Sequence, residues 1–411
     1  AIDGYDTNPI KCDSYFYGTV NINISGGIVN QTIYGAGAGG VSGYNENSTD
    51  VYKSYGESIN TAVNINISGG TIDADIYGGG YGYTNYLTAN STQVDGGTLY
   101  GDSYINISGS PTINGNIYGA GRGYDLASDK PDLAQMVGNS NITITGNPNI
   151  LGKIYGAGMG LSEYSEMAKL IGTSTININA DLAVNVYGGG NIAKTLGNTY
   201  IHINEGEHLA DIYGGGNVGI INGTSYVEIN GGVSNNIYGG GHQAGVNNTI
   251  IDILGGESNT VYGGSNESGD VETTTINVQN GVVGDIFGGN NQGGTCNETH
   301  IEIYGGNVTG AIYGGGNEVA TENTEIIMQN TTNTIPYIFG GGKAADVKIT
   351  NITINAGTAD KIFGGSNTNG VAQNTFIQVN NGNINSIYGG NNEGGTTNNS
   401  NIVVDNGNIA N

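Results

Sequence analysis

Three residues with acid, base or metal-binding side chains recur at intervals of about 25 residues in the middle of the chain. They are His202, Glu228 and Asp252, and each stands between two aliphatic residues. A histidine and two carboxylates could bind a metal ion or transfer protons if the fold brought them together. The same pattern also arises if the three residues simply form a row of exposed polar side chains, because charges in water interact weakly. We favour this second explanation, and we expect no catalytic residue, no metal site and no enzyme activity.

A second motif with known chemistry is the glycine pattern in "YGAGAGG". Gly35, Gly37 and Gly40 satisfy G-x-G-x-x-G, which in dinucleotide-binding folds lets the backbone approach a pyrophosphate at the start of a helix. No helical period follows here, and similar glycine clusters recur along the whole chain. We therefore interpret these glycines as a corner of a repeat, and we expect no cofactor.

Composition restricts the partners. The 411 residues include 77 Gly, and 10 Lys plus Arg against 35 Asp plus Glu give a net charge of −25. Nucleic acids and anionic lipids both require a basic surface, so we expect neither as a partner. No apolar run approaches the roughly 18 residues of a spanning helix, which excludes membrane insertion by a helix.

The chain is built from one repeated unit. An aliphatic residue, an aromatic ring and a glycine recur thirteen times, and an alternating x-I-x-I-x segment lies about eleven residues ahead of each ring. The rings are Tyr34, Tyr77, Tyr118, Tyr155, Tyr187, Tyr213, Tyr238, Tyr262, Phe287, Tyr313, Phe339, Phe363 and Tyr388. Later copies are about 25 residues apart, whereas the first four intervals are longer.

Each unit contains at least two short strands and two glycine corners. Alternation places paired isoleucines such as Ile176 and Ile178 on one face and polar residues such as Asn177 on the other. One unit cannot bury its isoleucine face, but stacked units pair every strand with the next copy. The sequence thus predicts an all-β parallel β-solenoid of about 13–14 coils, with two layers or three faces. We expect the glycines of both corners to supply positive φ angles.

The rings should form a ladder along the rod. Because neighbours in a strand point to opposite faces, an inward Ile76 predicts an outward Tyr77, and thus an external aromatic column; a bend at the glycines would reverse the faces. The column either stiffens the rod or offers a stacking platform for sugars, and we favour the first. The central members are Tyr77, Tyr118, Tyr155, Tyr187, Tyr213, Tyr238, Tyr262, Phe287 and Tyr313.

Spacing suggests three regions: an N-terminal segment (1–19), coils with long corner insertions (20–172) and regular coils (173–411). Four basic residues fall in the insertions, namely Lys53, Arg122, Lys130 and Lys169. Insertions at one corner accumulate on one flank, so this flank is a candidate lateral interface; solvated decoration explains it equally well.

The chain has two cysteines, Cys12 and Cys296. They lie about nine coils apart, or roughly 43 Å at 4.8 Å per coil. A disulfide needs Cα atoms within about 7 Å, so one straight rod cannot close this bond. Both thiols could be free or buried and inert. On an oxidising cell surface, the alternative is an intermolecular disulfide between Cys12 and Cys296, or between each cysteine and its symmetry mate.

The repeated "NINISGG...IYGGG" unit resembles the Gly/Asn-rich β-solenoid repeats of microbial surface proteins, including adhesin-like proteins, over residues 20–411. It also resembles the sheath protein of filamentous methanogenic archaea, whose subunits form a tubular sheath of stacked hoops. This resemblance implies stacked β-arches that assemble into hoops.

These observations together predict a structural protein at the cell surface. The last copy, "NIVVDNGNIAN", stops before its ring and glycine corner, and open strand edges recruit other chains. We expect an extracellular homopolymer with end-to-end and lateral contacts. The alternative is an adhesin or carbohydrate-binding module, with glycans as partners.

Overall fold

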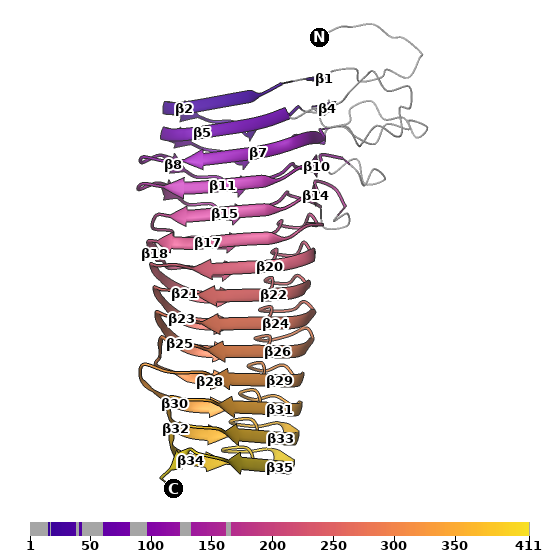
Figure 1. Cartoon of the computed structure of the whole chain (residues 1–411). Helices are drawn as coiled ribbons and strands as arrows, with labels where there is room; N and C mark the ends of the chain where they lie inside the picture. Colours follow the sequence, from indigo (N-terminus) through magenta and orange to yellow (C-terminus); the bar gives the residue numbers. More distant parts are fainter. Residues whose placement is uncertain are drawn as a thin grey trace, which may run out of the picture.

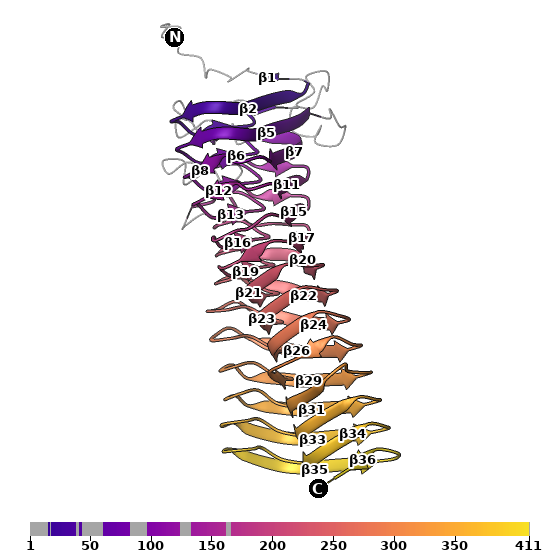
Figure 2. The same ribbon diagram turned by 90° about the vertical axis from the view of Figure 1, so that its left-hand side faces the viewer.

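The computed structural model describes residues 15–16, 18–37, 41–42, 61–82, 97–123, 133–161 and 166–410, and all regular structure within them is β-strand. The strands stack in parallel into one long rod, with β2 (Val20–Val29) near one end and β35 (Thr396–Val404) at the other (Figures 1 and 2). The predicted fold class is confirmed: the chain is a parallel β-solenoid, in which about nine turns keep a period of about 25 residues.

Two sheets form the walls of the rod. The remaining strands of the first sheet, sheet A, are β1 (Tyr15–Phe16), β4 (Val41–Ser42), β5 (Thr61–Ile72), β7 (Leu99–Ile107), β8 (Thr112–Ile113), β10 (Met136–Val137), β11 (Ser140–Thr145), β12 (Asn149–Ile150), β14 (Leu170–Ile171), β15 (Ser174–Asn179), β17 (Thr199–Glu205), β20 (Ile221–Ile229), β22 (Val246–Ile253), β24 (Val271–Val278), β26 (Cys296–Ile303), β29 (Thr321–Met328), β31 (Val347–Ile354) and β33 (Val371–Val379).

Sheet B collects the shorter strands that follow in each coil. They are β3 (Ile33–Tyr34), β6 (Ile76–Tyr77), β9 (Ile117–Tyr118), β13 (Ile154–Tyr155), β16 (Val186–Tyr187), β18 (Glu207–His208), β19 (Ile212–Tyr213), β21 (Val233–Tyr238), β23 (Glu257–Tyr262), β25 (Val282–Phe287), β27 (Asn307–Val308), β28 (Ala311–Tyr313), β30 (Thr334–Phe339), β32 (Thr358–Phe363), β34 (Asn383–Tyr388) and β36 (Asn408–Ile409). The short segment that follows the first strand of a coil belongs to sheet A in β8 and β12 but to sheet B in β18 and β27.

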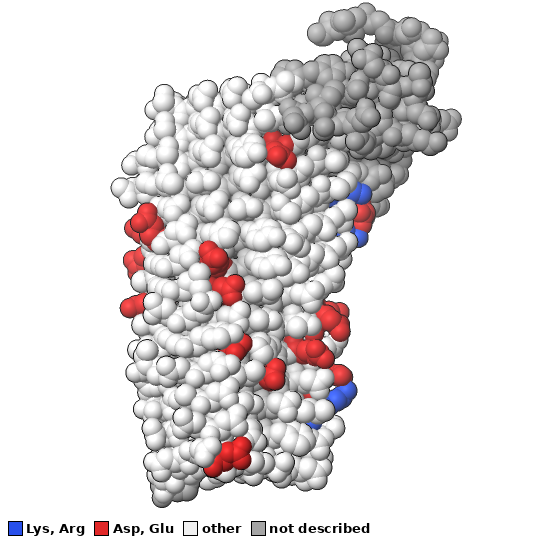
Figure 3. Space-filling model, in the orientation of Figure 1, with Lys and Arg blue, Asp and Glu red and all other residues white. Residues whose placement is uncertain are grey.

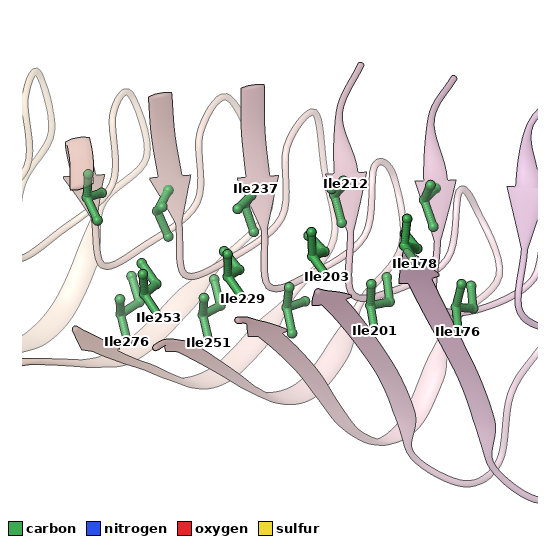
Figure 4. Close-up of a cluster of buried hydrophobic side chains, with 14 of the residues drawn as sticks. Ile176, Ile178, Ile201, Ile203, Ile212, Ile229, Ile237, Ile251, Ile253 and Ile276 are labelled. Carbon is green, nitrogen blue, oxygen red and sulfur yellow. The ribbon is translucent and has the colours of Figure 1, made fainter. Parts of the chain in front are cut away.

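The main core lies between the two sheets. Pairing is in register, so that Ile251 of β22 lies beside Ile276 of β24 and Ile253 beside Val278. These side chains are fully buried and pack against sheet B residues such as Ile237 (Figure 4). Burying continuous aliphatic rows gives the largest favourable contribution to stability, at roughly 25 cal/mol per Å² of apolar surface.

The two sets of glycines have different physical roles. At the corner between the sheets, Gly256 and Gly281 have φ values of 70° and 83°, as expected. After the ring, Gly288 lies outside the left-handed region, so a positive φ is not its reason. A Cβ there would meet the Gly314 carbonyl oxygen of the next coil and approach Thr299 Cβ to 2.9 Å. The expectation of a positive φ at the glycine after the ring is therefore wrong, and this position requires glycine because neighbouring coils approach each other closely there.

Candidate functional site

The rings of the aromatic column stack continuously along the rod. From Tyr34 to Tyr388, successive centroids are 4.6–5.2 Å apart and neighbouring ring planes differ by no more than 12°. The spacing equals the distance between strands, because one ring is contributed by each coil. Such stacks contribute about 0.5–1.5 kcal/mol per pair beyond the burial of area.

The expectation that this column is external was wrong. Tyr77, Tyr187 and Tyr213 are fully buried, as are most other members. They do point away from the isoleucines, but the glycine-rich segment that returns to sheet A covers them and makes a second, narrow core. For example, the Asn266 side chain in that segment donates a hydrogen bond to the Tyr213 hydroxyl at 3.1 Å.

Burial has changed the chemistry of these phenols. The Tyr213 hydroxyl donates to Asp211 at 3.1 Å, and desolvation, reinforced by that carboxylate, raises the pKa of Tyr213 far above its usual range. The same cause, with Asp285 nearby, raises the pKa of Tyr262 to about 12. The buried rings are thus neutral packing elements that offer no open face on which a sugar could stack, whereas the last ring, Tyr388, is 46% exposed.

A ladder of buried hydroxyl groups was not predicted. Thr249, Thr274 and Thr324 each donate a hydrogen bond of 2.6 Å to the carbonyl of the glycine that follows the ring in the same coil. The bond ties sheet A to the returning segment and satisfies a buried backbone acceptor. The signal in the sequence was the Ser or Thr two residues before the first isoleucine of nearly every I-x-I unit.

The row of His202, Glu228 and Asp252 exists. The three residues occupy paired positions of β17, β20 and β22 on the outer face of sheet A. His202 Nδ1 lies 3.2 Å from Glu228 Oε1, and a hydrogen bond from Asn230, followed by the His202 ring, lowers the pKa of Glu228 although partial burial opposes this. Asp252 instead accepts a 2.7 Å bond from Asn277. The described residues contain no group of three or more His, Cys, Asp or Glu with the geometry of a metal site.

Cys296 is buried in the wall of the rod. It is a free thiol at the start of β26, stacked between Val271 and Thr321, with 2% of its surface exposed. Because this position points inward, Cys296 could reach another chain only if its coil opened, which argues against the expected crosslink. Cys12, Lys53, Lys130 and Gly40 lie outside the described residues, and Gly35 and Gly37 lie at the coil corner that follows β3.

We expect Cys296 to be almost unreactive in the folded protein. Burial raises the pKa of its thiol to about 12, so the thiolate fraction at pH 8 falls by roughly a thousandfold relative to an exposed cysteine. In a Cys12→Ser variant, a thiol reagent should label Cys296 rapidly in guanidinium and at least a hundredfold more slowly in buffer. Rapid labelling of the native protein would show that the position of Cys296 is wrong.

A polar break interrupts one column of the main core. His208 is 3% exposed, and neither ring nitrogen has a well-formed hydrogen-bond partner among the described residues. The next residues of the same column are Ser234 and Ser258, whereas Leu182 and Val283 flank the break. Desolvation lowers the pKa of His208, which keeps the ring neutral.

This buried histidine should make stability depend on pH. The unfolded chain binds a proton near pH 6.5 while the folded chain resists it, so the free energy of unfolding falls as pH drops below about 6.5. We expect His208→Leu to remove part of this loss, measured as the change in melting temperature between pH 8 and pH 5. The control Leu182→Ile, at the aliphatic neighbour of His208 in the same column, changes no titratable group and should keep the wild-type slope. An unchanged slope in His208→Leu would contradict the buried neutral ring.

No family model, no curated protein and no solved structure matches the chain. Within the described residues, no helix has the length and hydrophobicity needed to cross a bilayer. The inference of function therefore rests on the geometry of the rod.

Proposed function

We propose that the chain is an extracellular structural protein whose solenoid units stack into a cell-surface sheath, layer or filament. The observation that carries this proposal is the uniformity of the coil-to-coil contact. The strand pairing, the stacked rings and the hydroxyl ladder repeat with the same register from one coil to the next. A contact that joins coils within a chain can join subunits by the same hydrogen bonds and packing.

The contact between neighbouring coils inside the rod shows what such a joint would use. β24 pairs with β22 on one side and with β26 on the other, and Ile276 is fully buried between Ile251 and Ile301. A strand of another subunit that met a coil in this register would be held by the same backbone hydrogen bonds and aliphatic contacts. Stacking of this kind is head-to-tail, so it gives a filament or a closed hoop according to whether the rotation closes. A sheath of hoops, as in filamentous methanogenic archaea, is the narrower form of the proposal.

The second candidate is an adhesin or carbohydrate-binding module. The buried column no longer supports it, but exposed rings elsewhere do. Phe376, on the outer face of β33, is 43% exposed, and Tyr304, directly after β26, is 48% exposed. Exposed aromatic faces are the usual platforms for sugar rings. This candidate therefore predicts saccharide binding by isolated chains.

Electron microscopy of the purified protein over a range of concentrations, combined with a glycan array, separates the two candidates. We expect rods that lengthen by whole subunits as concentration rises, and no tight saccharide binding. Single rods at every concentration, together with tight binding of a saccharide, would overturn the structural proposal in favour of the adhesin.

A further inference from the structure

One part of the outer face of sheet A is almost free of charge, and its one described carboxylate, Asp102 near the start of β7, accepts a hydrogen bond from Tyr104 at 3.4 Å. On β2, β5, β7, β11 and β15, the outward residues of the central segments are Asn or Thr, apart from one Tyr. The segments are 21–23, 64–66, 104–106, 141–143 and 175–177, and their outward side chains are here called the neutral face. In a chain with a net charge of −25, this is a notable exclusion of charge.

Farther along the rod the middle of the same surface is acidic. From β20 to β29, outward positions carry Glu228, Asp252, Glu302 and Glu325. On β31 to β35 the same positions are uncharged again, but they include exposed apolar residues such as Phe376 and Val403. Figure 3 shows the contrast: the part of this face over β2 to β15 is almost entirely white, whereas acidic groups dot its middle and the edges of the rod. Two copies of this chain would therefore repel each other least if their neutral faces met.

The side chains of the neutral face are already ordered by hydrogen bonds along the rod. Asn64 donates to the Asn21 side chain at 3.0 Å, Asn66 donates to Asn23 at 2.9 Å, and Asn106 donates to Asn66 at 2.9 Å. The donating amides of Asn64, Asn66 and Asn106 each use one N–H in this ladder and keep the other N–H for an outside partner. Since these side chains have lost part of their rotamer freedom, a contact made through them loses less entropy.

We propose that the neutral face is the lateral contact between two copies of this chain. Parallel, in-register strands with identical outward side chains form the kind of surface that pairs sheet to sheet, about 10 Å apart, with ladders of Asn interdigitating. Amides both donate and accept, so the face is complementary to itself. This inference rests on the proposed structural function and names the surface through which the rods associate side by side.

A second copy fits the neutral face better than a glycan does. Sugar-binding surfaces depend on aromatic platforms, and of the outward residues on this face only Tyr104 is aromatic. Five strands about 4.8 Å apart, with three residues of about 3.3 Å in each segment, present roughly 240 Å² per copy. A pair of such faces buries less than the roughly 1,200 Å² of a standard specific interface. One contact should be weak, and many contacts along an assembled rod should add to a stable layer.

The test adds two negative charges to the neutral face and compares them with two charges added elsewhere on sheet A. The face variant is Asn66→Asp with Thr143→Asp, and the matched control is Thr275→Asp with Thr353→Asp, all at outward positions. Sedimentation velocity measures pairing, and electron microscopy counts rods that lie side by side. We expect the control to pair like the wild type and the face variant to pair at least tenfold more weakly, with an unchanged melting temperature.

The exposed single variant Asn23→Asp, on the first strand of the stack, repeats the test if the double variant folds poorly. If the face variant folds and pairs as strongly as the wild type, the inference is overturned. End-to-end strings that never pair laterally also overturn it and leave the proposed function standing. Lateral pairs without end-to-end assembly would support the inference and overturn the proposed function. Binding of a neutral polysaccharide that the face variant loses, without self-pairing, would assign the face to a glycan and overturn the inference.

Discussion

Ile253→Asp is expected to destabilise the rod by about 4 kcal/mol or more, which is among the largest effects of any single side-chain change. Ile253 is fully buried between the two sheets. Its replacement removes apolar contacts and places a carboxylate, without a partner, among aliphatic side chains. Thermal and urea unfolding followed by circular dichroism would measure the loss, and hydrogen exchange should show it first in β22 and the strands paired with it.

The matched control is the preceding residue. Asp252 points outward and accepts a hydrogen bond from Asn277, so Asp252→Asn retains an acceptor in water and should change stability by no more than about 1 kcal/mol. If the two variants melted at similar temperatures, the assignment of inward and outward faces in sheet A would be wrong.

Gly288→Ala should cost about 3 kcal/mol or more, although it adds only one methyl group. The new Cβ would overlap the Gly314 carbonyl oxygen and crowd Thr299 Cβ at 2.9 Å. Both neighbours belong to the next coil, where strand pairing holds the backbone on either side, so they cannot move away cheaply. Unfolding by urea would measure the effect.

Gly26→Ala is the control for this prediction. A Cβ at Gly26 meets no atom within 4 Å, and the residue does not need a positive φ. We expect its stability to remain within about 0.5 kcal/mol of wild type. An equal loss in the two variants would mean that the crowding between coils at Gly288 is absent in solution.

The main core could be predicted from the sequence because alternation is a local property. Ile251 and Ile253 are one residue either side of Asp252, and a period of two assigns them to one face whatever the rest of the chain does. The register between coils also followed, since the repeat places Ile276 beside Ile251 as soon as the coils stack. These features require only the pattern and the stacking of copies.

The second core could not be predicted in the same way. Alternation places Tyr213 on the far side of its strand from Ile212, which is correct, but it does not say whether that side faces water. The answer depends on the path of the glycine-rich segment, which folds back over the rings and places Asn266 against the Tyr213 hydroxyl. Because that segment has no periodic pattern, its path could not be inferred from the sequence.

The contacts of the polar candidate residues could not be predicted from the sequence either. The row of His202, Glu228 and Asp252 follows from the repeat, but their hydrogen-bond partners depend on rotamers that the sequence does not determine. The inward direction of Cys296 was also hidden, because the strand β26 begins at that residue and alternation in the I-x-I unit does not extend unambiguously to a corner.

Cryo-electron microscopy of the concentrated protein tests the central claim, stacking of subunits into a continuous solenoid, most directly. The account predicts strings of rods in which the strand spacing of about 4.8 Å continues without a gap from one subunit into the next, over lengths well beyond the roughly 60 Å that thirteen ring-bearing coils span at this spacing. Isolated rods at every concentration, or strings whose strand ladder is interrupted at each junction, would contradict it.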